Sequence, residues 1–210
     1  MNTPPAWSRV CGSGPLLPTA GISALEVVTV FALLTALVAV AAPAVGNLGA
    51  AVSARSAAAE VSAAFFRARA YSLSSGRYVG LKFQKNGDRH EWALYRDGNG
   101  NGIRTLEIAS GVDRSLGVSY PWSRNDVRPG ILTGSRVPDP GSPGHYLDRL
   151  DDPIRFGNSD ICSFSPVGES SPGSVYLWDG RDRMAVVRVF DRTAKIRALY
   201  YRRGQKGWTR

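Results

Sequence analysis

Residues 21–45 read GISALEVVTVFALLTALVAVAAPAV, and the interpretation of the whole chain starts from this stretch. No charged residue lies between Glu26 and Arg55. A helix needs about 20 apolar residues to cross the core of a bilayer, and Val27–Val45 satisfies this length, so we expect a transmembrane helix here. A carboxylate at the end of such a segment is costly, about 2.5–3.5 kcal/mol if it lies deep in the membrane. We therefore expect Glu26 to have a function and a partner.

The same stretch resembles the class III signal of type IV pilins and type II secretion pseudopilins. In this comparison Gly21 corresponds to the last leader residue, Ile22 to the first mature residue and Glu26 to the fifth mature residue. Pro43 falls where many members have a helix-kinking proline. The resemblance implies that a prepilin peptidase cuts between Gly21 and Ile22 and methylates the new amine. It also implies that mature subunits stack into a filament through their apolar helices.

The chain departs from this family in two ways. Ile22 stands where the family more often has Phe or Met, and the leader has only Arg9 as a basic residue. The alternative for the stretch is an ordinary signal anchor or a secretory signal peptide. A secretory peptide has a basic start and a short apolar core that ends in a small-residue cut site, whereas this apolar run is longer and continues into a helical pattern.

The chemistry of the three signal residues fits this resemblance. Glycine lets a protease hold the backbone closely, because it has no side chain. Cleavage would leave an α-amine at Ile22 with a pKa of about 8. Glu26 of one subunit could pair with the amine of its neighbour, which would fix the axial register. This hypothesis predicts that Glu26→Ala leaves membrane insertion intact but blocks assembly.

Composition and pattern divide the 210 residues into one membrane segment and one soluble domain. We expect a leader at 1–21, a long helix at 22–75 that spans the membrane in its first half, and a periplasmic β domain at 76–210. Leu48, Val52, Val61, Phe65 and Ala68 fall near helical spacing and predict the buried stripe of the helix. The net charge of +9 permits contact with nucleic acid or anionic lipid but proves neither.

After Gly76 the hydrophobic period changes to two, which is typical of strands. Asn86-Gly87 predicts a hairpin turn, and the segment 174–201 predicts a three-stranded meander. The expected fold class is α+β, with a long N-terminal pilin-like transmembrane helix packed on a small antiparallel β domain of two sheets. The end of the chain, from Ser165-Pro-Val-Gly168 through the meander, resembles the GspH/FimT group of minor pseudopilins. A Pro/Gly-rich region at 121–153 has no periodicity, and we expect an exposed loop there, either a partner surface or a tolerated insertion.

Basic residues gather in the last predicted strand and the tail, with tyrosines and a tryptophan between them. Cations and aromatic rings together are what nonspecific DNA contact uses. FimT-like minor pilins bind DNA through a motif of the form Gly-Arg-x-Arg, and this chain has Ala194-Lys-Ile-Arg197 at the comparable place. The candidate DNA-contacting residues are Lys195, Arg197, Arg202 and Arg203. The alternative is a solvated basic edge that limits strand aggregation.

Other motifs give little support for a metal site or for catalysis. Asp97–Gly102 reads DGNGNG and matches the first half of a calcium loop, but the twelfth position is Ile108 where calcium needs an acid. The alternative, a Gly/Asn turn, is favoured. His90 and His145 have no ligand spacing to each other or to Cys162. We therefore expect no metal, no cofactor and no enzymatic activity.

The resemblance to this family implies a minor pseudopilin that acts as a structural subunit in a type II secretion pseudopilus or a type IV pilus, with a role in protein secretion. The expected location is the bacterial inner membrane, with a single membrane pass and the C-terminal domain in the periplasm. The expected partners are the prepilin peptidase, other pseudopilins or pilins, and the membrane. A minor pilin that captures DNA for uptake is the alternative.

Overall fold

The structure is a computed structural model that describes residues 21, 23–87, 89–117, 120–122, 126–190 and 193–210. Within these residues the chain forms two helices and ten strands, and the strands make two antiparallel sheets. The chain divides into two compact units, residues 1–44 and residues 45–210. The expected leader at 1–20 and the expected first mature residue, Ile22, lie outside the described residues.

Helix α1 (Ala24–Ser75) is 52 residues long. Ser23 caps its N-terminus, because the Oγ atom of Ser23 accepts a hydrogen bond of 3.2 Å from the N–H of Leu25. The alanine-rich sequence has high helix propensity. The helix ends at Gly76, whose φ of 63° lies in the left-handed region that glycine adopts without strain.

The expected transmembrane helix, and with it the expected fold class, is wrong. Among the described residues no helix combines the length and the apolar character that crossing a membrane requires. The same finding contradicts the expected location as a single-pass inner-membrane protein with a periplasmic C-terminal domain.

In the unit formed by residues 45–210, one face of α1 is buried. Its buried apolar side chains recur every three or four residues, as one face of a helix requires: Ala54, Ala57, Ala58, Val61, Ala64, Phe65 and Ala68. Val61, Phe65 and Ala68 are therefore in the stripe that the sequence predicted. Val52 is not, because 64% of its surface is exposed.

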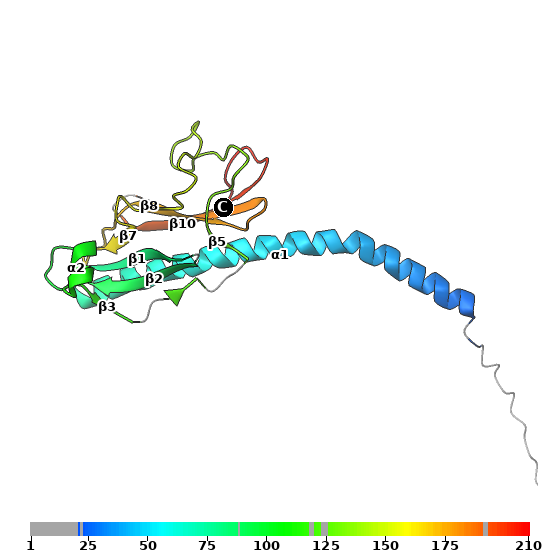
Figure 1. The fold of residues 1–210 in the computed structure, drawn as a ribbon, viewed down its shortest axis with the longest axis horizontal. Helices are drawn as coiled ribbons and strands as arrows, with labels where there is room; N and C mark the ends of the chain where they lie inside the picture. The colour runs from blue at the N-terminus through cyan, green and yellow to red at the C-terminus, as the bar shows by residue number, and fades with distance from the viewer. Residues whose placement is uncertain (1–20, 22, 88, 118–119, 123–125, 191–192) are drawn as a thin grey trace, which may run out of the picture. The chain divides into compact units, whose positions relative to one another are not determined.

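The first sheet has the strand order β3-β2-β1-β7, and β4 also pairs with β2. Strands β1 and β2 form the predicted hairpin, with Val79 opposite Arg96 and Asn86 opposite Arg89. Figure 1 shows these two strands alongside the C-terminal part of α1. The strands of this sheet are β1 (Val79–Asn86), β2 (Arg89–Arg96), β3 (Arg114–Ser115), β4 (Tyr120–Pro121) and β7 (Ile161–Phe164). A short helix, α2 (Thr105–Ser110), follows β2 and was not expected.

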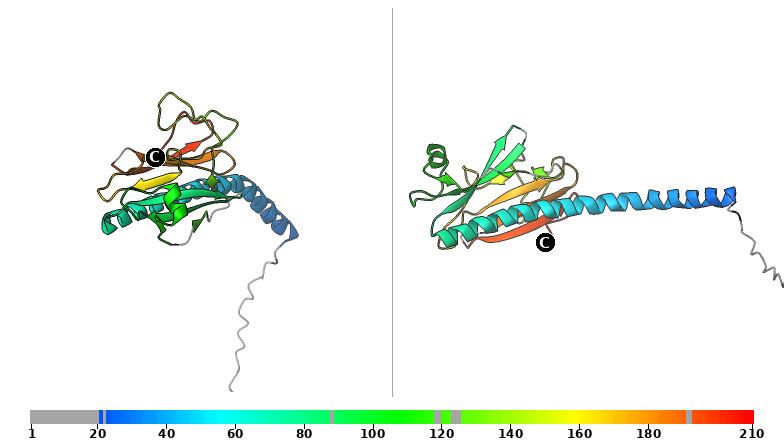
Figure 2. Two further views of the ribbon diagram at one scale, coloured as in Figure 1. Left: turned by 60° about the vertical axis from the view of Figure 1, so that its left-hand side comes forward. Right: turned by 90° about the horizontal axis from the view of Figure 1, so that it is seen from below.

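The second sheet has the strand order β10-β9-β8-β5, and β6 also pairs with β8. Strands β8, β9 and β10 form the predicted meander, and they cover residues 173–202 where the sequence predicted 174–201. Figure 2 shows this sheet from two further directions. Its strands are β5 (Arg128–Pro129), β6 (Ile154–Arg155), β8 (Gly173–Trp178), β9 (Arg183–Phe190) and β10 (Lys195–Arg202).

The main hydrophobic core joins α1 to both sheets. Phe65 of α1 is fully buried and contacts the rings of Phe83 and Phe164, both in the first sheet. It also contacts the ring of Phe156, which directly follows β6 of the second sheet. A second cluster lies on the other face of the second sheet, where Tyr176, Met184 and Tyr201 pack against apolar residues of the Pro/Gly-rich region. These are Ile131, Leu132, Val137 and Leu147. The region at 121–153 is irregular as expected, but it is not simply exposed, because it buries these four side chains.

Candidate functional site

The N-terminal end of α1 presents the residues of the predicted processing signal. Gly21 is exposed, and no atom lies within 4 Å of the position that a Cβ would occupy there. Glu26 lies in the first turn of the helix, three residues after the capping Ser23. Among the described residues no group donates a hydrogen bond to the Glu26 carboxylate or forms an ion pair with it.

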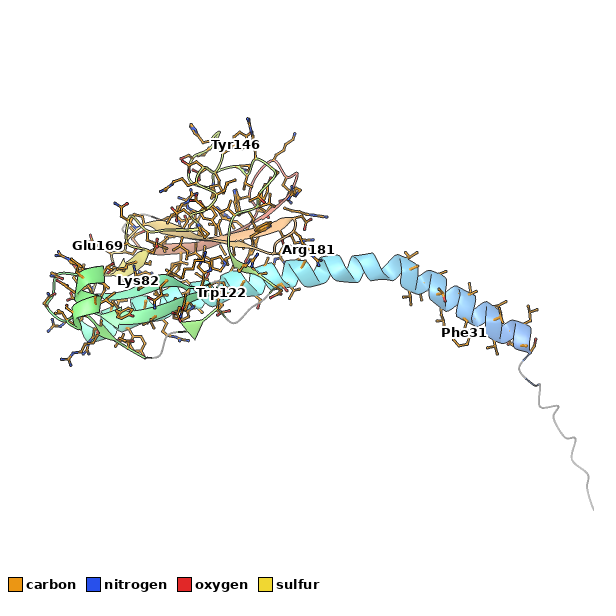
Figure 3. The ribbon with its side chains drawn as sticks, in the orientation of Figure 1. Phe31, Lys82, Trp122, Tyr146, Glu169 and Arg181 are labelled. Atoms are coloured by element: carbon orange, nitrogen blue, oxygen red, sulfur yellow. The ribbon has the colours of Figure 1, made fainter. Side chains whose placement is uncertain are left out.

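The helix surface that follows Glu26 is apolar and uncovered. Large apolar side chains are exposed at ten positions between Leu25 and Val40, with 66% of Phe31 and 71% of Leu33 accessible. Figure 3 shows Phe31 projecting from α1. The two polar side chains here are satisfied within the helix, since Thr29 donates to the carbonyl of Glu26 at 2.9 Å and Thr35 to that of Phe31 at 2.7 Å. This surface can therefore be buried without leaving an unpaired polar side chain.

The four candidate DNA-contacting residues do not form one site. Lys195 opens β10 and is opposite Phe190, whereas Arg202 closes the strand and is opposite Arg183. Seven residue steps of about 3.4 Å separate the two ends, which places them about 24 Å apart. The structure therefore divides the predicted set into a pair at the start of β10 and a pair at its end.

The pair at the end of β10 is engaged within the fold. The Nε atom of Arg202 is 3.1 Å from Oδ2 of Asp182. The guanidinium of Arg203 donates to the backbone carbonyls of Thr133, at 3.2 Å, and Arg181, at 3.3 Å. These contacts join the end of β10 to the turn between β8 and β9 and to Thr133 of the Pro/Gly-rich region.

Near the start of β10, Arg197 belongs to a cationic and aromatic group that the sequence alone did not identify. Arg197 is directly opposite Arg188 of β9, and both guanidinium groups stack over the ring of Phe190, at 5.7 and 4.8 Å from its centroid. The Nε and Nη1 atoms of Arg188 are buried without a hydrogen-bond partner in the described part of the chain. The sequence predicted both strands of this hairpin but not which residues lie opposite each other. With that register, Arg188 and Arg197 could have been identified as neighbours.

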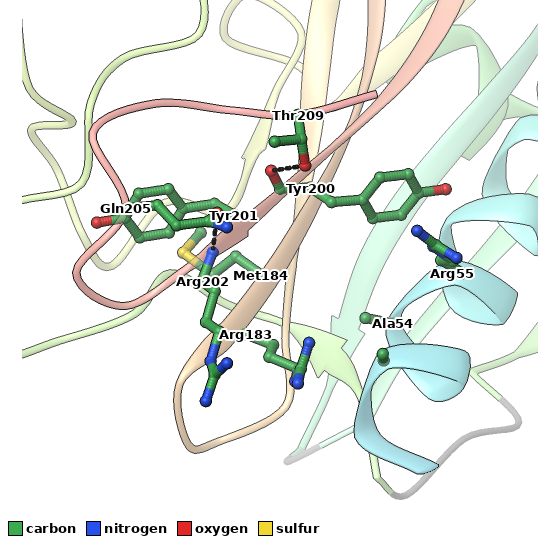
Figure 4. A pocket seen from close by; sticks show the side chains of 10 residues that line it. Ala54, Arg55, Arg183, Met184, Tyr200, Tyr201, Arg202, Gln205 and Thr209 are labelled. Carbon is green, nitrogen blue, oxygen red and sulfur yellow. Dashed lines mark hydrogen bonds between the residues drawn. The ribbon is translucent and has the colours of Figure 1, made fainter. Parts of the chain in front are cut away.

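A pocket of about 260 Å³ lies between α1 and the end of the second sheet (Figure 4). The guanidinium of Arg55 stacks over the ring of Tyr200 at 5.6 Å, and Arg183 and Arg202 also line the pocket. Arg202 donates its backbone N–H to Oε1 of Gln205 at 2.9 Å. No carboxylate, imidazole or thiol belongs to the side chains that line it. The polar groups that line the pocket are guanidinium groups, the hydroxyls of Tyr200, Tyr201 and Thr209, and the amide of Gln205.

The DGNGNG loop uses its first carboxylate to fold a turn. Asp97 is buried and accepts backbone N–H bonds from Asn99 at 2.9 Å, Gly100 at 2.8 Å and Gly102 at 2.9 Å. Burial by itself would raise the pKa of Asp97, but these three bonds and the charge of Arg77 lower it below its ordinary value. In the described residues no group of three or more His, Cys, Asp or Glu side chains is placed to hold a metal ion. The loop is thus built as a hydrogen-bonded turn.

The remaining titratable candidates are separate from one another. Cys162 is a free thiol that is completely buried, and burial raises its pKa well above the usual value. His90 lies in β2, where burial and then the charges of Lys85 and Arg128 lower its pKa. His145 is exposed in the Pro/Gly-rich region. The thiol is unsuited to nucleophilic chemistry, because the reactive form is the thiolate.

Comparisons of this chain with protein-family models, with curated proteins and with solved structures found no match. The resemblance to pilins therefore rests on the residues themselves. Gly21, Glu26 and the exposed apolar surface of α1 form the site that carries the functional argument.

Proposed function

We propose that this chain is a structural subunit of a pilin-type filament, a minor pseudopilin or minor pilin whose first helix packs against equivalent helices of neighbouring subunits. The observation that carries this proposal is the apolar surface of α1 from Leu25 to Val40. Its exposed residues fall on every side of the helix: positions 25, 27, 28, 30, 31, 33, 34, 37, 38 and 40. A helix that is apolar all round needs partners all round.

The free energy available from burying this surface is comparable to the cost of association. Burying one Val, Leu or Phe side chain completely is worth about 1.5–3 kcal/mol, so burying half of the ten would contribute on the order of 10 kcal/mol. Association costs an estimated 4–15 kcal/mol in lost translational and rotational freedom. Several helix neighbours, as in a helical array, would offset that cost.

Charge complementarity supports a like helix as the occupant of this surface. Glu26 is the one acid in the first turn of α1 and has no partner among the described residues. Cleavage after the exposed Gly21 would create a cationic amine at Ile22 in every subunit. Pairing between Glu26 and the amine of a neighbour would cancel both charges and set the axial offset between subunits.

Mass spectrometry of the protein isolated from the cells that produce it tests the processing step. We expect the mature chain to begin at Ile22 and to carry one methyl group on its amine. A protein that still begins at Met1, or that has been trimmed beyond Val40, would overturn the proposal.

Sedimentation of assembled material in the same cells tests the packing surface and the charge pair separately. We expect the Glu26→Ala protein to be processed but to be missing from the assembled fraction. We expect Leu33→Gln to reduce the assembled fraction strongly. The matched control is Leu106→Gln on α2, because Leu106 is also exposed, at 83%, but lies outside α1. Normal assembly of Glu26→Ala rejects the charge pair, and normal assembly of Leu33→Gln rejects α1 as the packing surface.

DNA capture is the second candidate function, and the group of Arg188, Arg197 and Phe190 favours it. Two guanidinium groups over one ring offer the combination of charge and stacking that single-stranded nucleic acid uses. If the full chain binds oligonucleotides, we expect Arg197→Gln to weaken binding and to reduce its salt dependence by about one counterion. Arg67→Gln, an exposed arginine on α1, is the control. Equal effects of the two substitutions would reject this candidate.

A further inference from the structure

A second cavity, also lined by arginines, is formed by residues from the end of α1, the end of α2 and β3. Figure 1 shows these elements at one end of the first sheet. The volume of the cavity is about 550 Å³. Arg77, Arg96 and Arg114 line it, and Asp97 is the one acid that does. This cavity is separate from the apolar surface of α1 and from the pocket beside Arg55.

Two of these arginines are placed against each other by the strand register. Arg96 of β2 is directly opposite Arg114 of β3. Like charges directly opposite across a strand pair are destabilising. In the described residues none of the three arginines forms an ion pair. No ion pair in the described residues therefore offsets the repulsion between Arg96 and Arg114.

The nearby carboxylates are already committed to backbone groups. Asp97 is 2% exposed, and both of its oxygens accept backbone N–H bonds within the DGNGNG turn. Asp113, next to the cavity, is also 2% exposed, and it accepts from the N–H groups of Gly98 at 3.3 Å and Arg104 at 2.9 Å. Neither acid can turn to a guanidinium without breaking its turn. The cavity thus keeps a positive charge with unused N–H donors.

We propose that this cavity binds a phosphate-type oxyanion, and that the ligand is a small molecule with a pyrophosphate or phosphate-ester group. Guanidinium groups donate two parallel hydrogen bonds to such oxygens and lose little hydration in doing so. The volume lies in the range of small-molecule sites, about 300–1,000 Å³, and exceeds what a single phosphate fills. A bound oxyanion would also relieve the repulsion between Arg96 and Arg114. Filament assembly through α1 does not require this site, so an experiment that rejects one proposal does not reject the other.

Thermal unfolding and calorimetric titration of the full-length chain test the site, with pyrophosphate, orthophosphate and citrate as probes at constant ionic strength. We expect a saturable rise in unfolding temperature with pyrophosphate and a weaker rise with orthophosphate. Arg96→Gln or Arg114→Gln should weaken pyrophosphate binding at least tenfold. The matched control Arg67→Gln removes the same charge from an exposed position outside the cavity and should bind as the wild type does.

A second readout separates a ligand site from a purely structural role. Without any anion, Arg114→Gln should be at least as stable as the wild type, because the substitution removes the repulsion with Arg96. Three results would overturn the proposal: no saturable effect at millimolar pyrophosphate, equal binding by Arg67→Gln and Arg96→Gln, or clear destabilisation of anion-free Arg114→Gln. Citrate binding as tightly as pyrophosphate would overturn the assignment to phosphate chemistry.

Discussion

Phe65 and Phe156 meet edge to face, with ring centroids 5.8 Å apart and ring planes at 74°. Phe65 comes from α1, and Phe156 directly follows the strand β6 of the second sheet. The ring of Phe156 also stacks on Phe83 of β1, at 6.2 Å. One helix side chain therefore contacts rings associated with both sheets, which makes it the central contact of the main core.

We predict that Phe65→Ala lowers the free energy of unfolding by about 3–5 kcal/mol, the usual cost of removing a buried ring. Denaturant unfolding of the full chain measures it. Phe66→Ala is the matched control, because Phe66 is the next residue but is 53% exposed, and its effect should stay within about 0.5 kcal/mol. Similar losses for the two variants would show that this core is not organised around Phe65.

Asp97→Asn should remove part of the acid sensitivity of the fold. The pKa of Asp97 is lowered in the folded state, so its contribution to stability is present above its unfolded pKa of about 4 and is lost as the pH falls through the folded value. We expect Asp97→Asn to cost about 1–3 kcal/mol at pH 7 and to show a shallower loss of stability below pH 4 than the wild type.

The control for this prediction is Asp151→Asn, which changes an exposed carboxylate. Its unfolding profile against pH should follow that of the wild type. Parallel profiles for Asp97→Asn and the wild type below pH 4 would mean that the turn does not depend on the charge of Asp97.

Gly173→Ala should destabilise the second sheet where β8 passes β6. A Cβ at Gly173 would collide with the ring of Phe156 and with the backbone carbonyl of Arg155. We expect a loss of about 1–3 kcal/mol in the free energy of unfolding, as for other overpacked sites. Gly207→Ala is the control, since no atom lies within 4 Å of a Cβ built there. A Gly173→Ala variant as stable as Gly207→Ala would contradict the close packing of β8 on β6.

The Cys162 thiol should be unreactive in the folded protein. Burial raises its pKa well above the usual value and also blocks reagents, so we expect alkylation at pH 8 to be about 100-fold or more slower than in the unfolded chain. The measurement is best made in a Cys11→Ser background, which leaves Cys162 as the one thiol. Equal rates in native and denaturing buffer would show that the β1–β7 edge opens freely.

Where side chains alternate regularly, the sequence was sufficient to predict structure. The hairpin of β1 and β2 and the meander of β8, β9 and β10 follow from period-two patterns and turn residues. The buried face of α1 was predicted for Val61, Phe65 and Ala68, but Val52 is exposed because the buried stripe passes through Ala54, Ala57 and Ala58 instead. Local periodicity does not say where a helix meets its domain.

Features that depend on contacts between distant segments were missed. The second core cluster draws Leu132 and Val137 from a region with no period, so no pattern marked them. The basic residues of β10 looked like one group in the sequence, yet Lys195 and Arg202 lie at opposite ends of the strand. Arg202 also forms an ion pair with Asp182. Arg96 and Arg114 are neighbours only through the pairing of β2 with β3. The transmembrane expectation was based on the apolar run Val27–Val45, but no helix among the described residues is both long and apolar enough to cross a membrane.

The pairing of β1 has a consequence for the order of events during synthesis. One edge of β1 pairs at once with β2, but the other edge pairs with β7, where Val79 is opposite Phe164. Until β7 leaves the ribosome, a nascent chain therefore carries a hairpin with an open hydrogen-bonding edge. Non-local pairing of this kind slows folding and exposes the intermediate to aggregation. A holding chaperone that covers β1 during translation would thus act on this protein at its most vulnerable stage.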